Sequence, residues 1–362
     1  MSSAPAVPVR ALVVGYGSAG RGIHVPLLQQ AGVEVAGVVT GNPGRVAQVG
    51  EDLPGVTAYP DLAAALRAVQ AGEVQVDLVV IASATGAHVE QTREVVQAGL
   101  PVVVDKPLAT DSPLAMELVD AARGLVPLTV FQNRRYDPDV RTLRSLLEQG
   151  ALGEVMRAEM RWERWRPDPK DRWREQAPAD QGGGVLLDLH AHTVDAGVPL
   201  FGPVEKVYAE LAARGTVAEN EAFLSLTHAS GVISHLGVTG LAPAPGPRWR
   251  VLGTRASYLM GGLQGELGGL RELDDADADH CGWLYDGGQR RAVKAAPHGQ
   301  VEFYAAVRDA VLRRDEGVEA VQEAMPVDPE EAVHVLAVLD AARHCADNGG
   351  VERVVTPGVG PA

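Results

Sequence analysis

Residues 181–195, QGGGVLLDLHAHTVD, combine a run of glycines with a carboxylate and an imidazole at helical spacing. Asp188 and His192 are four residues apart, so on a helix both side chains leave the same face and the carboxylate can hold and polarise the ring. A His oriented by an Asp is a general acid/base pair. A structural His paired with a carboxylate near a helix start has the same spacing, so the choice depends on whether other segments support chemistry.

His190 lies between these two residues, and the three side chains together also suggest metal ligands. On a helix, however, residues two apart point to nearly opposite sides. His190 and His192 are therefore not expected to bind one ion, and we predict no metal site.

A second chemical pattern, Gly-Tyr-Gly-Ser-Ala-Gly at 15–20, fits GxGxxG and stands between an expected strand and a helical segment. Gly15 permits a tight turn, Gly17 lets the backbone approach a pyrophosphate, and Gly20 lets the helix pack close to the strand. We therefore predict a dinucleotide site. Its expected contacts are Gly15, Tyr16, Gly17, Ser18, Ala19 and Gly20, with Ser83, His88 and Lys106 from later loops.

The end of the second expected strand decides which dinucleotide fits. It reads Val-Thr-Gly-Asn at 39–42 and lacks the carboxylate that would bind the ribose hydroxyls of NAD. Thr40 and Asn42 can donate hydrogen bonds and Arg45 can pair with a 2′-phosphate, which favours NADP. If Arg45 instead faces solvent, the site also tolerates NAD.

Lys106 stands in the segment Val-Val-Val-Asp-Lys-Pro at 102–107. It follows an expected parallel strand, and the carboxyl ends of such strands form the edge at which doubly wound sheets bind ligands. A lysine without context is usually a surface residue. Here Pro107 fixes the local backbone and the glycine motif lies at the same edge, so we predict Lys106 to be a site residue.

The elements that must position these residues follow from alternating aliphatic and helical segments. Strands are expected at 11–14, 33–39, 77–82, 102–104 and 128–131, with helices between them, one of them capped by Asp61 at 62–70. This is the pattern of an α/β, doubly wound parallel sheet. After a helix near 140–148, strand-like segments at 154–164, 204–212, 222–228, 232–238 and 249–251 predict an α+β domain with a large open, largely antiparallel sheet. We expect a Rossmann domain at 8–131 and a substrate-binding and oligomerisation domain at 132–350.

Composition excludes several classes of function. The 362 residues carry a formal charge of -15, which argues against nucleic-acid and acidic-membrane partners. The two cysteines, Cys281 and Cys345, form neither a disulfide framework nor a zinc motif, which fits a reducing cytoplasm. Residues 1–10 lack the basic start and the long apolar segment typical of a signal peptide, and no apolar run reaches the roughly eighteen residues of a membrane span, so neither export nor membrane anchoring is expected. We expect a cytoplasmic protein without membrane partners.

Several motifs in this order resemble the Gfo/Idh/MocA oxidoreductase family, most closely its branch of NADP-dependent scyllo-inositol 2-dehydrogenases. They are the glycine motif continued by His24 and Pro26, the tripeptide at 105–107, residues 132–137, residues 171–175, and the segment with Asp188, His192 and Asp195. The likeness runs from about residue 10 to residue 345 and covers both expected domains.

The resemblance implies hydride transfer between nicotinamide and a secondary alcohol or ketone of a cyclitol or sugar, in a homodimer or homotetramer. It implies that Lys106 acts at the substrate oxygen, that Asp188 positions substrate and His, and that His192 is the catalytic acid/base. Alcohol oxidation does need a base for the hydroxyl proton and a cation for the developing alkoxide. Further substrate contacts are expected from Asn133, Arg135, Tyr136, Arg172, Trp173 and His235, although an Arg beside a Trp is equally compatible with surface packing.

The chain departs from the family pattern at three positions. Asp105 begins a tripeptide that most often begins with Glu, His190 stands where Gly is common, and Ala84 stands where Pro is common. His190 is expected to narrow the pocket and Ala84 to loosen the loop beside the cofactor.

Two other functions fit the same fold. One is a non-catalytic, dinucleotide-sensing regulator, which the joint presence of Lys106, Asp188 and His192 disfavours. The other is a reductase of a different carbonyl class, such as an imine or a bile pigment. Only the pocket lining distinguishes that enzyme from a sugar or cyclitol dehydrogenase.

Overall fold

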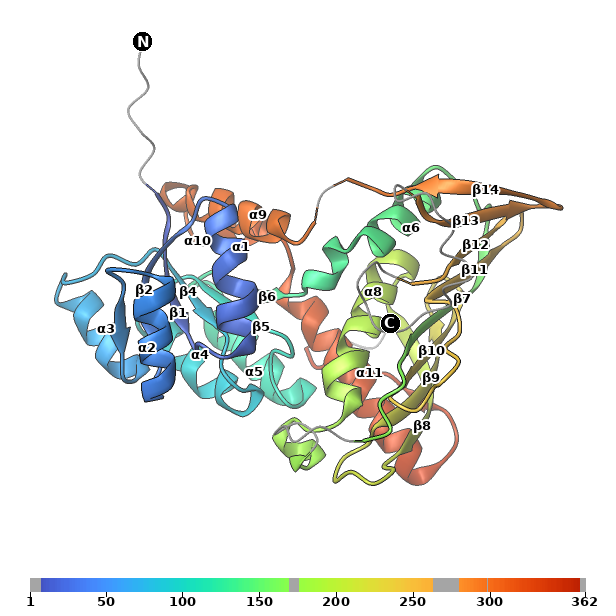
Figure 1. Ribbon diagram of the computed structural model, residues 1–362, viewed down its shortest axis with the longest axis horizontal. Helices are drawn as coiled ribbons and strands as arrows, with labels where there is room; N and C mark the ends of the chain where they lie inside the picture. The colour runs from blue at the N-terminus through green and yellow to red at the C-terminus, as the bar shows by residue number, and fades with distance from the viewer. Residues whose placement is uncertain (1–7, 169–175, 263–279, 298, 359–362) are drawn as a thin grey trace, which may run out of the picture. The chain divides into compact units, whose positions relative to one another are not determined.

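The computed structural model describes residues 8–168, 176–262, 280–297 and 299–358 (Figure 1). These residues form two compact units. Unit 1 comprises 8–109, 113–133 and 300–332, and unit 2 comprises 110–112, 134–299 and 333–358 within the described ranges. None of the helices in the described ranges has both the length and the apolar character needed to cross a bilayer.

Unit 1 contains a six-stranded sheet in the order β3-β2-β1-β4-β5-β6, with every pair of neighbours parallel. The strands are β1 (Arg10–Val14), β2 (Glu34–Val39), β3 (Thr57–Tyr59), β4 (Leu78–Ile81), β5 (Val102–Asp105) and β6 (Leu128–Phe131). Both faces of a parallel sheet are covered, so its strands need unbroken apolar runs, and all four residues of β4 are buried. The predicted Rossmann sheet is confirmed, and β3 is a strand that the prediction lacked.

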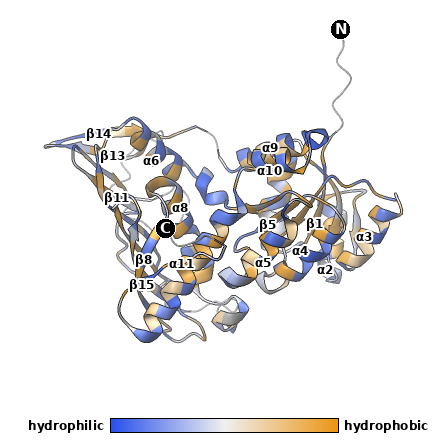
Figure 2. Ribbon diagram, turned by 180° about the vertical axis from the view of Figure 1, so that it is seen from behind, coloured by the Kyte–Doolittle hydropathy of each residue, from blue (hydrophilic) through white to orange (hydrophobic). Residues whose placement is uncertain are grey.

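The helices that cover this sheet have boundaries at residues whose side chains favour a helix end. They are α1 (Val25–Gln30), α2 (Pro43–Asp52), α3 (Leu62–Gln70), α4 (His88–Gln97) and α5 (Ser112–Ala122). Asp61 caps α3 by accepting the Ala64 N–H at 2.7 Å, as predicted. In Figure 2 strands such as β1 and β5 are coloured hydrophobic, whereas these helices carry both colours, as expected for helices with one buried face.

The later part of the chain returns to unit 1, which differs from the predicted domain range of 132–350. The helices α9 (Val301–Val311) and α10 (Val318–Ala324) belong to this unit. The Gln322 side chain bonds both the N–H and the C=O of Leu128, at 2.8 and 3.1 Å. Thr129 Oγ1 donates to Val327 O at 2.8 Å. An apolar helix face shows that a helix is packed, but it does not show against which sheet.

Unit 2 contains a nine-stranded sheet in the order β14-β13-β12-β11-β7-β10-β9-β8-β15. The strands are β7 (Val155–Glu163), β8 (Val204–Ala212), β9 (Glu221–His228), β10 (Ile233–Thr239), β11 (Trp249–Gly253), β12 (Ser257–Met260), β13 (His280–Asp286), β14 (Gln289–Lys294) and β15 (Glu352–Arg353). Only the β7–β10 pair is parallel among the neighbours described. The large mixed sheet is therefore confirmed, and the prediction missed β12 to β15.

One face of this sheet is covered by the helices α6 (Pro138–Glu148), α8 (Ala191–Phe201) and α11 (Pro329–Asn348) (Figure 1). Side chains in β9 alternate strictly between half-buried and buried, as expected when one face meets helices. Ala209 N–H of β8 lies 3.2 Å from Cys345 Sγ of α11, and Val204 N–H lies 3.0 Å from His334 Nε2. The opposite face lacks such a helical layer among the described residues.

Candidate functional site

The glycine motif forms a tight turn between β1 and the first helix of unit 1. Gly15 has φ +98°, and a Cβ there would lie 2.7 Å from Ala82 O. At Gly20 a Cβ would lie only 2.0 Å from Gly15 O. Gly17 is different, because the nearest heavy atom to a Cβ there is Nη2 of Arg45 at 3.6 Å. The first and third glycines are thus required by the fold, and the second keeps the surface of the turn open for a ligand.

An open hollow of about 480 Å³ lies beside this turn. It is lined by Tyr16, Gly17, Ser18, Arg21, Gly22, Arg45 and Gln48. The structure thus brings Arg45, from α2, to the glycine turn, although the two are separated in sequence by the whole of β2. Backbone N–H groups at a helix start together with a guanidinium form a suitable environment for phosphate groups.

Arg21 and Asp52 form an ion pair at the rim of the hollow that the sequence did not reveal. The guanidinium contacts both carboxylate oxygens, at 2.5 and 3.0 Å, and Tyr16 Oη donates to Oδ2 at 3.0 Å. Partial burial, together with the hydrogen bond and charge of Asp52, raises the pKa of Tyr16 to about 12. Tyr16 therefore keeps its proton and serves as a donor. The adjacency of Arg21 to the third glycine is the one signal that could have identified this pair.

The residues at the end of β2 divide into structural and accessible groups. Asn42 caps α2 by accepting the Arg45 N–H at 3.1 Å, and Thr40 is 6% exposed. The Asn42 oxygen is therefore already used, which leaves its amide N–H₂ as a donor. Arg45 is exposed and lies against Gly17.

Ser83 and His88, predicted as cofactor contacts, brace two neighbouring loops. The ring of His88 is buried, with Nδ1 2.8 Å from Pro107 O and Nε2 3.2 Å from Ser83 O. Ser83 Oγ donates to Gln91 Oε1 at 2.6 Å. Burial lowers the pKa of His88 below its ordinary range. The structure thus assigns this ring to the support of the Lys106 loop, and its nitrogens face backbone oxygens.

Lys106 follows β5 at the carboxyl edge of the sheet, the edge that also carries the glycine turn. It is 8% exposed, and its N–H donates to Asp105 Oδ1 at 2.8 Å. The peptide bond to Pro107 is cis. Because β1 and β5 both pair with β4 in parallel, unit 1 alone brings the predicted cofactor turn and the predicted lysine to one edge.

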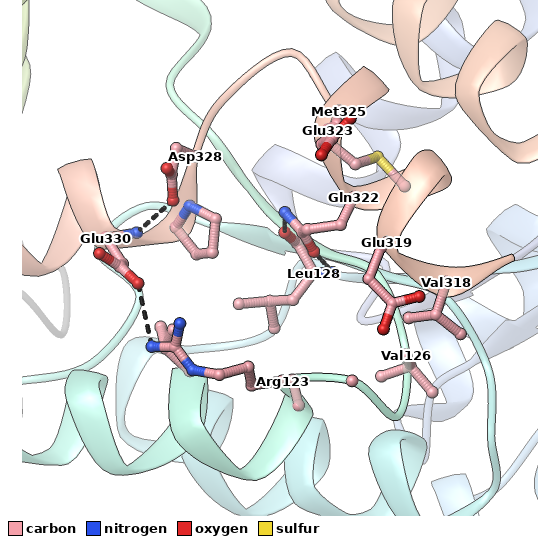
Figure 3. Close-up of a pocket in the computed structure, with 14 residues that line it drawn as sticks. Arg123, Val126, Leu128, Val318, Glu319, Gln322, Glu323, Met325, Asp328 and Glu330 are labelled. Atoms are coloured by element: carbon pink, nitrogen blue, oxygen red, sulfur yellow. Dashed lines mark hydrogen bonds and ion pairs between the residues drawn. The ribbon is translucent and has the colours of Figure 1, made fainter.

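A second cavity of unit 1, about 350 Å³, lies at the other edge of the same sheet (Figure 3). It is lined in part by Leu128, the first residue of β6, and by the Arg123–Glu330 ion pair, 2.9 Å long. None of the predicted site residues that the structure describes lines it. It therefore lies apart from the candidate cofactor site.

The segment with Asp188 and His192 belongs to unit 2 and begins with closely packed glycines. A Cβ on Gly184, which has φ +90°, would lie 2.3 Å from Glu219 Oε1, the atom that accepts the Leu186 N–H at 3.2 Å. The predicted helix is confirmed, but it opens with a π-helical turn, Leu186–His190. Asp188 is in this turn and His192 is in the first turn of α8. Hydrogen bonds in a π turn join residues five apart, a feature often found at functional sites.

His190 is a core residue of unit 2. Its ring is fully buried, with Nδ1 2.8 Å from Thr193 Oγ1 and Nε2 3.2 Å from Ala222 O. Burial lowers the pKa of His190 to about 4, so the ring is neutral at pH 7. The expectation that this residue narrows an open pocket is not supported, because the ring is held inside the unit. Within the described residues, no group of His, Cys, Asp and Glu is arranged to hold a metal ion.

The buried ring of His190 makes stability depend on pH. Its pKa is lower in the folded protein than the ordinary value of 6.5, so protons bind preferentially to the unfolded chain. The stabilisation that the neutral ring provides is fully present above pH 6.5. As the pH falls toward 4, the free energy of unfolding should decrease by about 3 kcal/mol. Urea unfolding between these pH values should show this loss, and His190→Gln should flatten the curve. His228, whose pKa burial also lowers, should retain part of the slope. An identical slope in His190→Gln would exclude His190 as its source.

Three guanidinium groups surround Trp162 beside His192, a cluster that the sequence did not predict. The guanidinium carbon, Cζ, lies 4.8 Å from the centroid of the Trp162 ring in Arg134, 5.2 Å in Arg164 and 4.4 Å in Arg248. The His192 ring centroid lies 5.8 Å from the same ring. Such a cluster offers hydrogen-bond donors for the oxygen atoms of a polar substrate.

Acids that pair with this cluster hold it in place. Arg248 lies 3.3 Å from Asp139, a fully buried carboxylate that also accepts Trp249 Nε1–H at 2.9 Å. Arg134 lies 2.7 Å from Asp137. These ion pairs fix the guanidinium groups of Arg248 and Arg134 beside the indole.

Arg135, predicted to contact substrate, is bound to Asp195. Its Nη2 lies 2.6 Å and its Nε 2.9 and 3.0 Å from the carboxylate oxygens, and the Asp195 side chain is 1% exposed. The pair joins the segment after β6 to α8 and orients the helix that carries His192. The role supported by these contacts is therefore positional.

The other predicted substrate residues are found in different surroundings. Asn133 is buried in unit 1, where Nδ2 donates to Gln300 Oε1 at 3.0 Å. Tyr136 is half-buried in unit 2, and Arg141 lies 6.0 Å from its ring. Arg172 and Trp173 lie outside the described residues.

His235 was predicted to face the substrate, and the structure corrects this prediction. In β10 it pairs with Glu159, whereas the next residue, Leu236, pairs with Met160. Leu236 and Met160 are buried on the helix-covered face, where Trp162 meets His192. Successive residues of a strand point to opposite faces, so His235 lies on the other face of the sheet. The sequence predicted the strand correctly but not which face the helices cover.

Comparison with known proteins gives consistent matches over both units. The profile described as "Oxidoreductase family, NAD-binding Rossmann fold" matches residues 9–128, and that of the GFO/IDH/MocA C-terminal domain matches residues 140–259. The uncharacterized oxidoreductase YdgJ of Escherichia coli is 31% identical, over 93% of this chain and 97% of that protein. The Bacillus subtilis scyllo-inositol 2-dehydrogenase (NADP(+)) IolW is 28% identical, over 91% of each chain. The structure of YPO2259 from Yersinia pestis superposes with a TM-score of 0.82 at 28% identity, over 97% and 98% of the two chains.

Proposed function

This chain belongs to the Gfo/Idh/MocA oxidoreductase family and is an NAD(P)-dependent dehydrogenase, and from that premise we propose that it uses NADP to interconvert a secondary alcohol and a ketone of a cyclitol or sugar. The observation that carries the cofactor choice is the position of Arg45, whose guanidinium lies against Gly17. The relative named as an NADP-linked scyllo-inositol 2-dehydrogenase supports the substrate class. The small polyol or sugar is the proposed partner.

The residues present fit a phosphate-bearing dinucleotide. The surface of Gly17 is open, the first helix begins directly behind it, and no carboxylate stands at the end of β2. A guanidinium at that end can form a bidentate contact with a 2′-phosphate, which a Lys or an amide cannot do equally well. When bound, NADP would supply the hydride acceptor.

Three side chains are proposed to handle the proton and the charge. His192 takes the hydroxyl proton of the alcohol and returns it in the reverse direction. Asp188 orients the His192 ring and contacts substrate hydroxyls. Lys106 stabilises the negative charge that develops on the substrate oxygen as hydride leaves. The Trp162 cluster contributes donors to the remaining hydroxyl groups.

A panel of compounds tests this proposal directly. Inositol isomers, aldoses and their oxidised forms should be assayed with NADP and NAD by the absorbance of the reduced nicotinamide. We expect turnover of at least one cyclitol or sugar, with higher kcat/KM for NADP. Turnover confined to a different carbonyl class would contradict the proposed substrate, and a clear preference for NAD would show that Arg45 does not reach the 2′-phosphate.

Thr40→Asp should move the preference toward NAD. A carboxylate at this position repels a 2′-phosphate and can accept ribose hydroxyls. Two charges about 4 Å apart near a surface interact by roughly 1–4 kcal/mol, so the ratio of kcat/KM values should change by about tenfold or more. Thr40→Asn is the matched control, because Asn has nearly the same shape as Asp but carries no charge. Equal effects of both variants would assign the change to packing.

We also propose a homodimer or homotetramer formed through the uncovered face of the unit 2 sheet. Ile233, Phe223 and His235 lie on that face, and apolar area without a covering layer favours association. Sedimentation at micromolar concentration should give a multiple of 38.1 kDa. Phe223→Arg should shift the mass toward the monomer, whereas Val217→Arg, at a 64% exposed residue outside the strands, should not. A wild-type monomer would refute this assembly.

A cytoplasmic location is part of the proposal. Cys281 and Cys345 are both free and buried. Burial, with a smaller effect of Asp139, raises the pKa of Cys281 to about 11, so this thiol is protonated and unreactive. A chain with two buried free thiols suits a reducing compartment.

A further inference from the structure

A line of buried polar groups in unit 1 leads from α9 to the Lys106 loop. Tyr304 Oη lies 2.5 Å from His24 Nδ1, His24 Nε2 lies 3.6 Å from Asp105 Oδ2, and Asp105 Oδ1 accepts the Lys106 N–H at 2.8 Å. Tyr304 and His24 are both completely buried. We propose that His24, backed by Tyr304, is a positioning residue for Lys106 and acts through Asp105. This inference rests on the proposed catalytic role of Lys106.

Tyr304 sets the proton arrangement of this line. Burial, and then the charge of Asp105, raise its pKa well above the ordinary range, so the phenol keeps its proton. A buried O–H needs an acceptor, and His24 Nδ1 is the partner that the described residues provide. Because Nδ1 accepts, a neutral His24 ring carries its proton on Nε2, the nitrogen that faces Asp105.

Asp105 is kept ionised by the groups around it. Burial alone would raise its pKa, but the contact with His24, and then the charges of Lys106 and His88, outweigh burial and hold the pKa below the usual range. The 3.6 Å separation from His24 Nε2 exceeds hydrogen-bond length, and the described residues offer Nε2 no other acceptor. A shift of about 0.5 Å would form the bond, as often happens when a ligand completes a site.

The ionised carboxylate in turn fixes the backbone that carries the lysine. Asp105 holds the Lys106 N–H, and His88 holds Pro107 O at 2.8 Å from the side of α4. The loop is thus anchored on both sides of Lys106. A small displacement of a catalytic group can reduce turnover by a large factor. The orientation of the Asp105 carboxylate, which holds the backbone of Lys106, therefore matters for the reaction.

A purely space-filling role makes a different prediction. The His24 ring packs against Phe131, with centroids 4.4 Å apart, and against Tyr304 at 6.0 Å. If packing were its only role, Leu would replace His24 without affecting Asp105. If His24 positions Asp105, Leu removes the donor and Gln, which has an amide N–H₂, restores it in part.

The experiment measures the ionisation of Asp105 and turnover in the full-length protein. Carboxyl carbon-13 NMR follows the Asp105 signal, identified by its absence from Asp105→Asn. In His24→Leu we expect the pKa of Asp105 to rise, the acid limb of the kcat profile to move to higher pH, and kcat at pH 7 to fall about tenfold. NADP affinity should be unchanged, and His24→Gln should recover part of kcat. Tyr304→Phe removes one hydroxyl group and should raise the pKa of Asp105 by a smaller amount. This second variant tests the inference even if His24→Leu does not fold.

The NMR titration distinguishes this inference from the proposed function. An Asp105 titration unchanged in both His24→Leu and Tyr304→Phe overturns the inference, whatever the turnover. A wild-type protein that turns over no compound of the panel counts against the proposed function, while the titration still decides the role of His24.

Discussion

His192→Ala is expected to lower kcat by on the order of a hundredfold or more, the usual contribution of a positioned acid/base. Lys106→Ala should have an effect of similar size, because the developing alkoxide then lacks its cation. NADP affinity should change little in either variant, since neither residue belongs to the glycine turn. Steady-state kinetics with the best substrate of the panel, together with NADP titration, measures both quantities.

The pH dependence separates a chemical role from a structural one. Alcohol oxidation should rise with pH through an apparent ionisation that His192→Ala alters, and the apparent value belongs to His192 and Lys106 together if they are coupled. His344→Ala is the matched control, because this ring is exposed on α11 and pairs with Glu352 at 3.0 Å. Near-normal turnover and an unchanged profile in His192→Ala would mean that the spacing of Asp188 and His192 is structural.

Elements with strong local signals were predictable from the sequence. Asp61 caps α3 at the predicted residue, and β8 and β6 have the predicted bounds. In each case the signal lies within a few residues, in a capping carboxylate or in an unbroken or alternating apolar run. The glycine motif was predictable for the same reason, because its steric requirements arise within one turn and the adjoining loop.

Features that depend on distant residues or on small backbone changes were not predictable. Apolar periodicity does not distinguish an α turn from the π turns Gly20–His24 and Leu186–His190. Arg248 reaches Trp162 only because β11 and β7 are neighbours in the sheet. The return of α9 and α10 to unit 1, the Arg21–Asp52 pair and the line from Tyr304 to Lys106 likewise depend on tertiary packing.

Gly17, Gly20 and Gly50 should respond to alanine in three different ways. At Gly20 the new Cβ would lie 2.0 Å from the backbone oxygen of Gly15, so the turn must move. We expect Gly20→Ala to reduce the free energy of unfolding by about 3 kcal/mol and to abolish NADP binding. At Gly17 the nearest atom is the flexible end of Arg45, at 3.6 Å. Gly17→Ala should therefore fold normally and still bind NADP poorly, because its methyl group occupies the approach of the pyrophosphate.

Gly50→Ala in α2 is the control, since Gly50 is not among the residues that line the hollow and no heavy atom lies within 4 Å of its added Cβ. Alanine also favours a helix over glycine by up to about 1 kcal/mol, so this variant should be as stable as the wild type or more stable, with unchanged NADP binding. Thermal unfolding and fluorescence titration of NADP on all three variants distinguish the effects. Normal NADP binding by Gly17→Ala would place the dinucleotide away from the glycine turn, and normal stability of Gly20→Ala would mean that helix and strand can separate at little cost. The contrast between Gly17 and Gly20 thus tests separately whether the motif is needed for binding or for packing.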